Sequence, residues 1–185
     1  MELSDNTIVE QVREGESEAY AEIVTRYQKP VFNLMYRFCH SEQDSAELTQ
    51  DVFCKAFEKL GSFQNGKSFF PWLYSLALNH GRDWLRKQER KRDGMRVYTD
   101  TQKQDGPLLP LEIVEKKQED STLLVALSCL SHENREILLL RYQQELSIGE
   151  LGEIFGLSKS AVKMRIHRAL SLLRDDLSEN YDVNK

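Results

Sequence analysis

The feature that most constrains this chain is a segment near its carboxyl end that encodes two short helices joined by a tight turn. Residues 135–174 have the sequence REILLLRYQQELSIGELGEIFGLSKSAVKMRIHRALSLLR. Ser147 and Glu150 have the spacing of a capping box, which marks where the first helix begins. Gly156 suits the left-handed end of that helix, and Ser158 suits the cap of the next. This order of signals predicts a helix-turn-helix motif.

The second helix of the motif has one apolar and one basic face. Its apolar residues recur at helical spacing and are Val162, Ile166, Ala169, Leu170, Leu173 and Leu177. The opposite face carries Lys159, Ser160, Lys163, Met164, His167 and Arg168. Residues 158–174 contain five bases and no acid, although acidic residues outnumber basic ones in the chain by 30 to 25. A solvated amphipathic helix would explain the charge alone, but charge, capping box and glycine turn together favour a DNA-recognition helix.

Composition limits the remaining possibilities. The 185 residues can form one domain or two small ones, and a hydrophobic fraction of 40% supports packed cores rather than global disorder. A net charge of -5 argues against a protein that coats nucleic acid without discrimination. Residues 1–22 contain seven acids and one base, so phosphate repels the amino end, which is left for some other contact.

No metal, cofactor or membrane signal is found in the sequence. Cys39, Cys54 and Cys129 are widely spaced, without a CxxC pair or a Cys/His cluster, so we expect reduced, buried thiols and neither disulfides nor zinc. No apolar run approaches 18 residues, and no apolar run follows a basic start. We therefore expect a cytoplasmic protein with no cofactor and no membrane contact.

The hydrophobic pattern is helical nearly throughout, which predicts an all-α fold of two helical modules joined by a flexible linker. The first module spans residues 1–92, with helices expected over 4–14, 18–28, 31–39 and 42–60 and another beginning at Pro71. Pro30 is expected to open the helix over 31–39. Gly and Pro interrupt residues 93–120, the predicted linker, and the second module spans 121–185, with helices over 121–130 and 131–143 before the motif.

Residues 61–68, GSFQNGKS, match the phosphate-binding pattern GxxxxGK[ST]. A true phosphate-binding loop follows a strand and opens a helix, whereas a helical stretch precedes this segment and Phe69, Phe70 and Pro71 separate it from the next helix. We therefore predict that the match is coincidental. An ATPase remains the rival function. Nucleotide hydrolysis that is lost in the Lys67→Ala variant would favour it.

The same loop combines aromatic, polar and basic residues. Its aromatic residues and those next to it are Phe63, Phe69, Phe70, Trp72 and Tyr74. Asn65, Lys67 and Ser68 lie among them, and Arg82, Arg86 and Arg90 follow at helical spacing. Such a mixture is typical of single-strand binding, because bases stack on rings while cations follow the backbone. The alternatives are that the rings pack the core, which is favoured for Phe69 and Trp72, and that the arginines form a solvated face.

The two modules in this order resemble a bacterial RNA polymerase sigma factor of the extracytoplasmic-function (ECF) group, which retains sigma regions 2 and 4. Residues 19–92 resemble region 2 through the segments AYAEIVTRYQKPVFNLMYRF, DSAELTQDVFCKAFEKLGSF and FFPWLYSLALNHGRDWLRKQER. The segment from LSHENREILLLRY to HRALSLLR resembles region 4. The resemblance implies a protein without bond chemistry whose partners are core RNA polymerase and promoter DNA, and it adds an anti-sigma factor as a candidate partner.

The resemblance also implies site residues. The helix that docks on the polymerase supplies Asp44, Glu47, Gln50 and Asp51. Capture of the minus-10 nontemplate strand falls to Phe63, Asn65, Lys67, Ser68, Phe70, Asn79, Arg82 and Arg86. Reading of the minus-35 element in the major groove falls to Lys159, Ser160, Lys163, Met164, Arg165, His167 and Arg168, with Arg141 and Arg165 expected as phosphate or structural contacts.

The chain departs from the family pattern at four positions in or next to these sites. Ala46 replaces a second acidic residue, and Ser160, Ala161 and Met164 replace the usual residues of the recognition helix. The promoter sequence therefore cannot be carried over from a relative. A stand-alone helix-turn-helix regulator is the alternative function: it would bind a palindromic site tightly as a dimer without polymerase, whereas a sigma factor should bind weakly until core enzyme is added.

Overall fold

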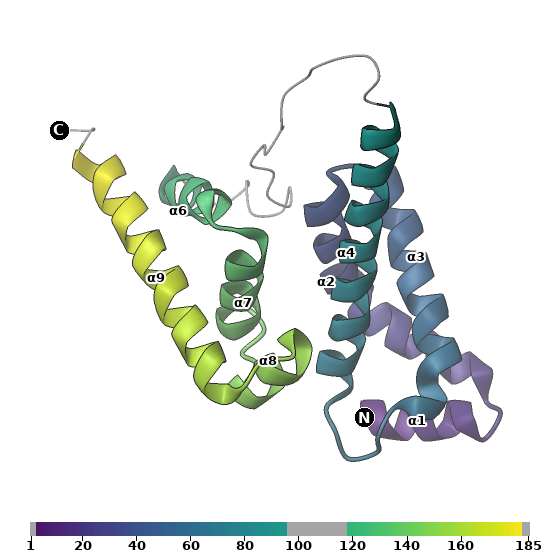
Figure 1. The fold of residues 1–185 in the computed structure, drawn as a ribbon. Helices are drawn as coiled ribbons and strands as arrows, with labels where there is room; N and C mark the ends of the chain where they lie inside the picture. Colours follow the sequence, from purple (N-terminus) through teal and green to yellow (C-terminus); the bar gives the residue numbers. More distant parts are fainter. Residues whose placement is uncertain (1–2, 96–117, 183–185) are drawn as a thin grey trace. The chain divides into compact units, whose positions relative to one another are not determined.

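The computed structural model describes residues 3–95 and 118–182, and in these ranges it contains helices and no strand. The all-α prediction is therefore confirmed. The chain divides into two compact units, Met1–Lys103 and Gln104–Lys185 (Figure 1), and the described residues of each unit form an apolar core of their own.

The first unit is a bundle of three long helices with a short helix across one end. Its elements are α1 (Asp5–Arg13), η1 (Ser17–Ala19), α2 (Tyr20–Cys39), α3 (Glu42–Lys59), η2 (Leu60–Ser62) and α4 (Phe69–Met95). Helices α2, α3 and α4 lie side by side, and α1 lies at the end where η2 and the loop into α4 are found (Figure 1). The core is formed mainly by Ile8, Ile23, Val31, Leu34, Met35, Val52, Ala56, Phe69, Leu73 and Leu78.

Serine caps begin two helices of this unit. Ser4 Oγ accepts a hydrogen bond from the Thr7 amide at 3.2 Å at the start of α1. Ser41 Oγ accepts one from the Asp44 amide at 3.3 Å at the start of α3. Because such caps satisfy amides that have no partner within the helix, they fix where the helix begins.

Pro30 does not open a helix, and the prediction of separate helices over 18–28 and 31–39 is wrong. Helix α2 continues from Tyr20 to Cys39 with Pro30 in its interior. A proline there costs about 3 kcal/mol. Ile23, Val31 and Leu34, on both sides of it, are each 0% exposed, and burial of such side chains stabilises by about 1.5–3 kcal/mol each. Continuous packing of one apolar face therefore outweighs the local cost of the proline.

The predicted linker at 93–120 is helical at both of its ends. Helix α4 continues to Met95, and α6 begins at Gln118. Residues 96–117 of the predicted linker lie outside the described residues.

The second unit contains the helices α6 (Gln118–Cys129), α7 (His132–Tyr142), α8 (Ile148–Phe155) and α9 (Lys159–Asp182). Helix α9 contacts each of the other three. Its buried residues Val162, Ile166 and Ala169 share a core with Ala126, Leu130, Ile137, Leu140, Leu151 and Ile154. The long final helix is thus held against a small apolar core by the face that its sequence pattern indicates.

Candidate nucleic-acid and polymerase interfaces

The turn between α8 and α9 has the geometry of a helix-turn-helix motif. Ser147 Oγ accepts from the Glu150 amide at 3.2 Å, and Glu150 Oε2 accepts from the Ser147 amide at 2.9 Å, so the predicted capping box is confirmed. Gly156 adopts the left-handed conformation with φ of 65°, and Ser158 Oγ accepts from the Ala161 amide at 3.2 Å. These local contacts define both the end of α8 and the start of α9.

A glycine that the sequence reasoning missed sets how closely the two helices approach. The Leu157 amide donates to the Gly152 carbonyl at 2.9 Å. A Cβ atom at position 152 would lie 2.8 Å from the Leu157 carbonyl oxygen, closer than real Cβ atoms come. The signal that could have found it is a glycine within a helical pattern, which often marks close packing.

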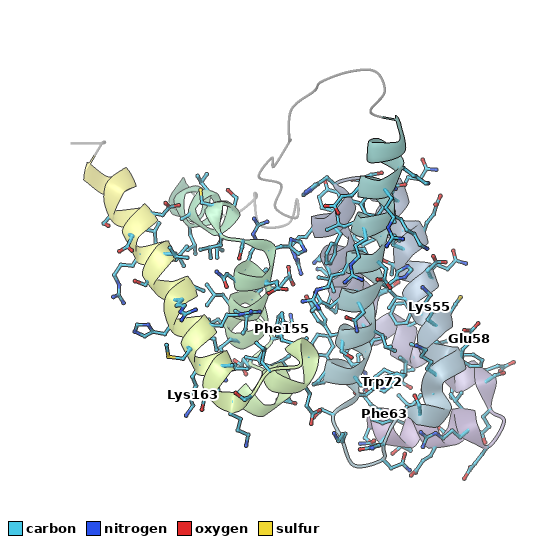
Figure 2. All side chains as sticks on the ribbon, in the orientation of Figure 1. Lys55, Glu58, Phe63, Trp72, Phe155 and Lys163 are labelled. Carbon is cyan, nitrogen blue, oxygen red and sulfur yellow. The ribbon has the colours of Figure 1, made fainter. Side chains whose placement is uncertain are left out.

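The two faces of α9 separate as the sequence predicts. Lys159, Ser160, Lys163, Met164, His167 and Arg168 are all exposed. Val162 and Ala169 are 0% exposed and Ile166 is 8% exposed. Figure 2 shows Lys163 projecting away from the core of the unit. Met164 is unusual among them because its apolar side chain is 53% exposed, which makes it available for a contact such as a thymine methyl group.

Two arginines of this unit have structural partners. Arg165 is half-buried and donates to Glu133 Oε2 at 2.7 Å, which connects α9 to α7. Arg141 donates to the Leu146 carbonyl at 2.7 Å and so secures the segment before α8. The sequence predicts that Arg141 and Arg165 contact either phosphates or the protein itself. Their hydrogen bonds are consistent with the structural role.

The loop before α4 rests on buried aromatic rings. Phe63 is 3% exposed and Phe69 is 1% exposed, and the Phe63 ring centroid lies 5.3 Å from that of Phe69 and 5.4 Å from that of Trp72 (Figure 2). The position of Phe63 differs from the predicted base contact, because its ring fills the core beneath the loop. The residues between these anchors, 64–68, are exposed, and Phe70 is half-buried beside Tyr27.

This loop does not have the setting of a phosphate-binding loop. It follows α3 and η2 rather than a strand. Helix α4 begins at Phe69, directly after Ser68, so the expectation of a helix beginning at Pro71 and separated from the match by Phe69, Phe70 and Pro71 is wrong. The helix that precedes the loop, where a phosphate-binding loop has a strand, is what distinguishes the two. The match of residues 61–68 to the GxxxxGK[ST] pattern is therefore coincidental.

Helix α1 makes several hydrogen bonds to the same loop, which the sequence reasoning missed. Arg13 Nη1 donates to Asn65 Oδ1 at 2.5 Å, and Arg13 Nη2 donates to the Leu60 carbonyl at 2.6 Å and to the Phe63 carbonyl. Asn65 Nδ2 donates in turn to Glu10 Oε1 at 3.0 Å. No pattern within the sequence signals these contacts, because 52 positions separate Arg13 from Asn65.

The basic residues of α4 follow one line along the helix. Asn79, Arg86 and Arg90 are exposed and Arg82 is half-buried. Arg86 Nη1 lies 3.2 Å from Asp83 Oδ1, and since both side chains are more than 60% exposed, this pair contributes little to stability. The spacing of the arginines at four-residue intervals brings them to one face, which could lie along a phosphate backbone.

Acidic and polar residues are displayed by α3 on the side away from its buried face. Glu47, Gln50 and Asp51 are exposed and Asp44 is half-buried, whereas Leu48 and Val52 lie in the core. This arrangement gives α3 a charged surface suited to docking on a complementary partner.

His80 on α4 joins this surface. Its Nδ1 lies 2.6 Å from Lys55 Nζ, and its Nε2 lies 3.5 Å from Asp51 Oδ2. Because an ammonium group only donates, Nδ1 must accept and the neutral ring carries its proton on Nε2, towards Asp51. Burial and the Lys55 charge both lower the pKa of His80, so the neutral ring is favoured.

The described residues offer no group of three or more His, Cys, Asp or Glu side chains arranged to hold a metal ion. Among the helices described, none is long and apolar enough to cross a bilayer. Cys39 is half-buried, whereas Cys54 and Cys129 are exposed, which differs from the expectation of buried thiols.

Fold and surfaces together define an all-helical, two-unit DNA-binding protein whose second unit ends in a helix-turn-helix motif. Residues 23–91 match the family model described as Sigma-70 region 2, and residues 126–175 match Sigma-70, region 4. The chain belongs to the sigma-70 family and is an alternative sigma factor of the ECF group, which acts in transcription initiation and is not an enzyme.

Two relatives illustrate this membership. The ECF RNA polymerase sigma factor SigW of Bacillus subtilis is 29% identical over 188 residues, a match that covers 97% of this chain and 100% of SigW. The ECF RNA polymerase sigma-E factor of Escherichia coli K12 is 28% identical over 175 residues, covering 91% of each chain.

Solved structures show the same fold. CnrH in complex with the cytosolic domain of CnrY matches with a TM-score of 0.67 and 24% identity, covering 98% of this chain and 99% of that one. The sigma factor RpoE in complex with the anti-sigma factor NepR from Bartonella quintana matches with a TM-score of 0.67 and 21% identity, covering 86% of this chain and 96% of that one.

Proposed function

We propose that this sigma factor selects promoters by reading the minus-35 element with α9 and by capturing the unpaired minus-10 strand with the loop before α4. The observation that carries the proposal is the exposed basic face of α9 within a complete helix-turn-helix motif. Lys159, Lys163 and Arg168 on that face can pair with guanine O6 and N7 or with phosphates. Ser160, Met164 and His167 supply the remaining contacts of the same face.

The first unit contributes the contacts to melted DNA. Asn65, Lys67 and Ser68 lie on the exposed loop. Phe70, in the first turn of α4, is half-buried, whereas Phe63 and Phe69 lie in the core. Asn79, Arg82 and Arg86 extend the surface along α4. The Phe70 ring would stack on an unpaired base while the arginines contact the phosphate backbone, and these contacts would keep the strand unpaired until transcription starts.

The acidic surface of α3 is the proposed contact to core RNA polymerase. Asp44, Glu47, Gln50 and Asp51 form it, and the polar character of this surface supports a partner of positive charge. Action on polymerase places the chain in the bacterial cytoplasm. One solved neighbour is a sigma factor bound to an anti-sigma factor, and we include an anti-sigma factor as a further candidate partner of this chain.

Run-off transcription from genomic fragments with core RNA polymerase and the purified chain tests the proposal. We expect transcription from a subset of fragments only when both components are present. Lys163→Ala should then reduce initiation through the minus-35 element, whereas Arg174→Ala, an equal loss of charge at an exposed position farther along α9, should not. Equal effects of both substitutions would show that general charge, and not the proposed face, attracts the DNA.

A stand-alone helix-turn-helix regulator is the competing function. It predicts tight binding of the chain alone to a palindromic duplex, with no effect of added core enzyme. The match to both sigma regions in one chain favours the sigma factor, because a stand-alone regulator has no use for a region 2 bundle.

A further inference from the structure

We propose that Glu10 and Arg13 of α1 are positioning residues that fix the orientation of the Asn65 side-chain amide and thereby set the base preference of the loop before α4. This inference rests on the proposed capture of unpaired minus-10 DNA by that loop. Glu10 and Arg13 lie three positions apart on α1 and therefore share one face of the helix.

The chemistry of the three side chains leaves one orientation of the amide. The Arg13 guanidinium only donates, and it contacts Asn65 Oδ1 at 2.5 Å. The Glu10 carboxylate only accepts, and it lies 3.0 Å from Asn65 Nδ2. A rotated amide would place its NH₂ group against the guanidinium and its oxygen against the carboxylate, losing both hydrogen bonds. Glu10 and Arg13 therefore specify which side of Asn65 donates and which side accepts.

The oriented amide keeps capacity for a base. An amide oxygen has two lone pairs and an amide NH₂ has two hydrogens, and the contacts to α1 use one of each. Because Asn65 is exposed, the second lone pair and second hydrogen remain available to the edge of an unpaired base. An amide held in one orientation presents its donor and acceptor in a fixed order, so it distinguishes bases whose edges carry those groups in opposite orders.

Arg13 also holds the backbone of the loop in place. Its Nη2 donates to the carbonyls of Leu60 and Phe63, on the two sides of the turn that follows α3. Asn6, about two turns earlier on α1, donates to the Lys67 carbonyl at 3.4 Å. The exposed residues 64–68 are therefore held in two ways: the Phe63 ring next to them packs in the core, and α1 donates hydrogen bonds to the loop. Preorganisation of this kind lowers the entropic cost of capturing a strand.

Holoenzyme made from core RNA polymerase and the full chain provides the test. It is mixed with a pool of single-stranded DNA randomised over the minus-10 region, and the bound fraction is sequenced. We expect Glu10→Gln, whose side-chain amide can either donate or accept, to reduce the base preference at one position by about fivefold. Glu14→Gln, the same change of charge on an exposed position at the end of α1, should leave the preference as in the wild type.

A double-mutant cycle establishes that the effect passes through Asn65. In an Asn65→Ala background the additional effect of Glu10→Gln on base preference should disappear. Arg13→Lys retains the charge but offers one nitrogen in place of the two guanidinium nitrogens that contact Asn65 and the loop carbonyls, so it should lower capture of all sequences as well as the preference at that position. Binding to core polymerase and to minus-35 duplex reports that each variant is folded.

The outcomes separate this inference from the function on which it rests. If wild-type holoenzyme selects no sequence from the single-stranded pool, the proposed function is wrong. If the wild type selects a sequence and both Glu10→Gln and Arg13→Lys select it equally well, the positioning role is wrong. An effect of Glu10→Gln that persists unchanged in Asn65→Ala would also overturn it, because the effect would then arise elsewhere in the loop.

Discussion

Among the glycines of α8, Gly152 is the one at which an added methyl group should disturb the packing of the second unit most. A Cβ atom there would lie 2.8 Å from the Leu157 carbonyl oxygen and 4.0 Å from Val162 Cγ2. Ordinary contact begins at 3.4 Å, so the Leu157 backbone, which leads into α9, must move by about 0.6 Å. A backbone oxygen cannot rotate away as the tip of a side chain can, and the strain therefore falls on the angle between α8 and α9.

Two opposing effects set the magnitude. Alanine gains about 1 kcal/mol over glycine in a helix interior. Overpacking costs about 1–3 kcal/mol, and the rigid backbone partner places Gly152→Ala in the upper part of that range. We therefore expect a net loss of about 1–2 kcal/mol in the free energy of unfolding. For a unit of this size the loss corresponds to a fall in Tm of about 5–15 °C.

Gly149→Ala is the matched control in the same helix. Its Cβ would lie 3.7 Å from Ser147 Oγ and 3.9 Å from Lys159 Cε, which are ordinary contacts. We expect it to be neutral or to stabilise by about 0.5 kcal/mol, because only the helix propensity changes.

Circular dichroism of the full chain follows both units, whereas tryptophan fluorescence follows only the first. Both tryptophans, Trp72 and Trp84, lie in the first unit. Gly152→Ala should lower the second unit's transition in circular dichroism and leave the fluorescence transition unchanged. A Gly152→Ala protein as stable as Gly149→Ala, or more stable, would refute the argument that close packing at this glycine sets the approach of the two helices.

Three further predictions concern charge and pH. Lys163→Ala should reduce the affinity of holoenzyme for minus-35 duplex by about 1–3 kcal/mol if Lys163 contacts a base, and gel shifts at several salt concentrations would instead show a slope smaller by about one if it contacts a phosphate. Arg135→Met should destabilise the second unit by about 2–3 kcal/mol in urea unfolding, because Arg135 donates to the carbonyls of Leu127, Ser128 and Leu130 at the end of α6, and an unchanged midpoint would contradict this. Because its folded pKa is lowered by burial and the Lys55 charge, neutral His80 contributes stability above pH 6.5 that is lost as the pH falls from there through the folded pKa. His80→Gln should therefore make the Tm of the first unit less sensitive to pH between 7 and 5. If the Tm of the wild type and of His80→Gln depended equally on pH, the pH dependence would arise from other groups.

Local signals in the sequence were sufficient for much of the second unit. The capping box at Ser147, the left-handed Gly156 and the cap at Ser158 depend on neighbours within three or four positions, and all are confirmed. The division of α9 into buried and exposed faces was equally predictable, because helical periodicity determines it.

Features that depend on distant parts of the chain were not predictable in this way. Pro30 lies inside α2 because Ile23, Val31 and Leu34 are buried along one continuous face, a tertiary effect that overrides the local preference of proline. The Phe63 ring lies in the core because Phe69 and Trp72 surround it. The contact between Arg13 and Asn65 joins positions 52 apart, and nothing near either residue indicates it.

A gel-shift comparison on a responsive promoter fragment tests the central claim most directly. The fragment is incubated with the chain alone, with core RNA polymerase alone, and with both. We predict a sequence-specific complex only when both are present, because in the proposed function the chain supplies recognition while the polymerase holds its two units on the promoter. Tight, specific binding by the chain alone, unaltered by core enzyme, would contradict the account and identify a stand-alone regulator.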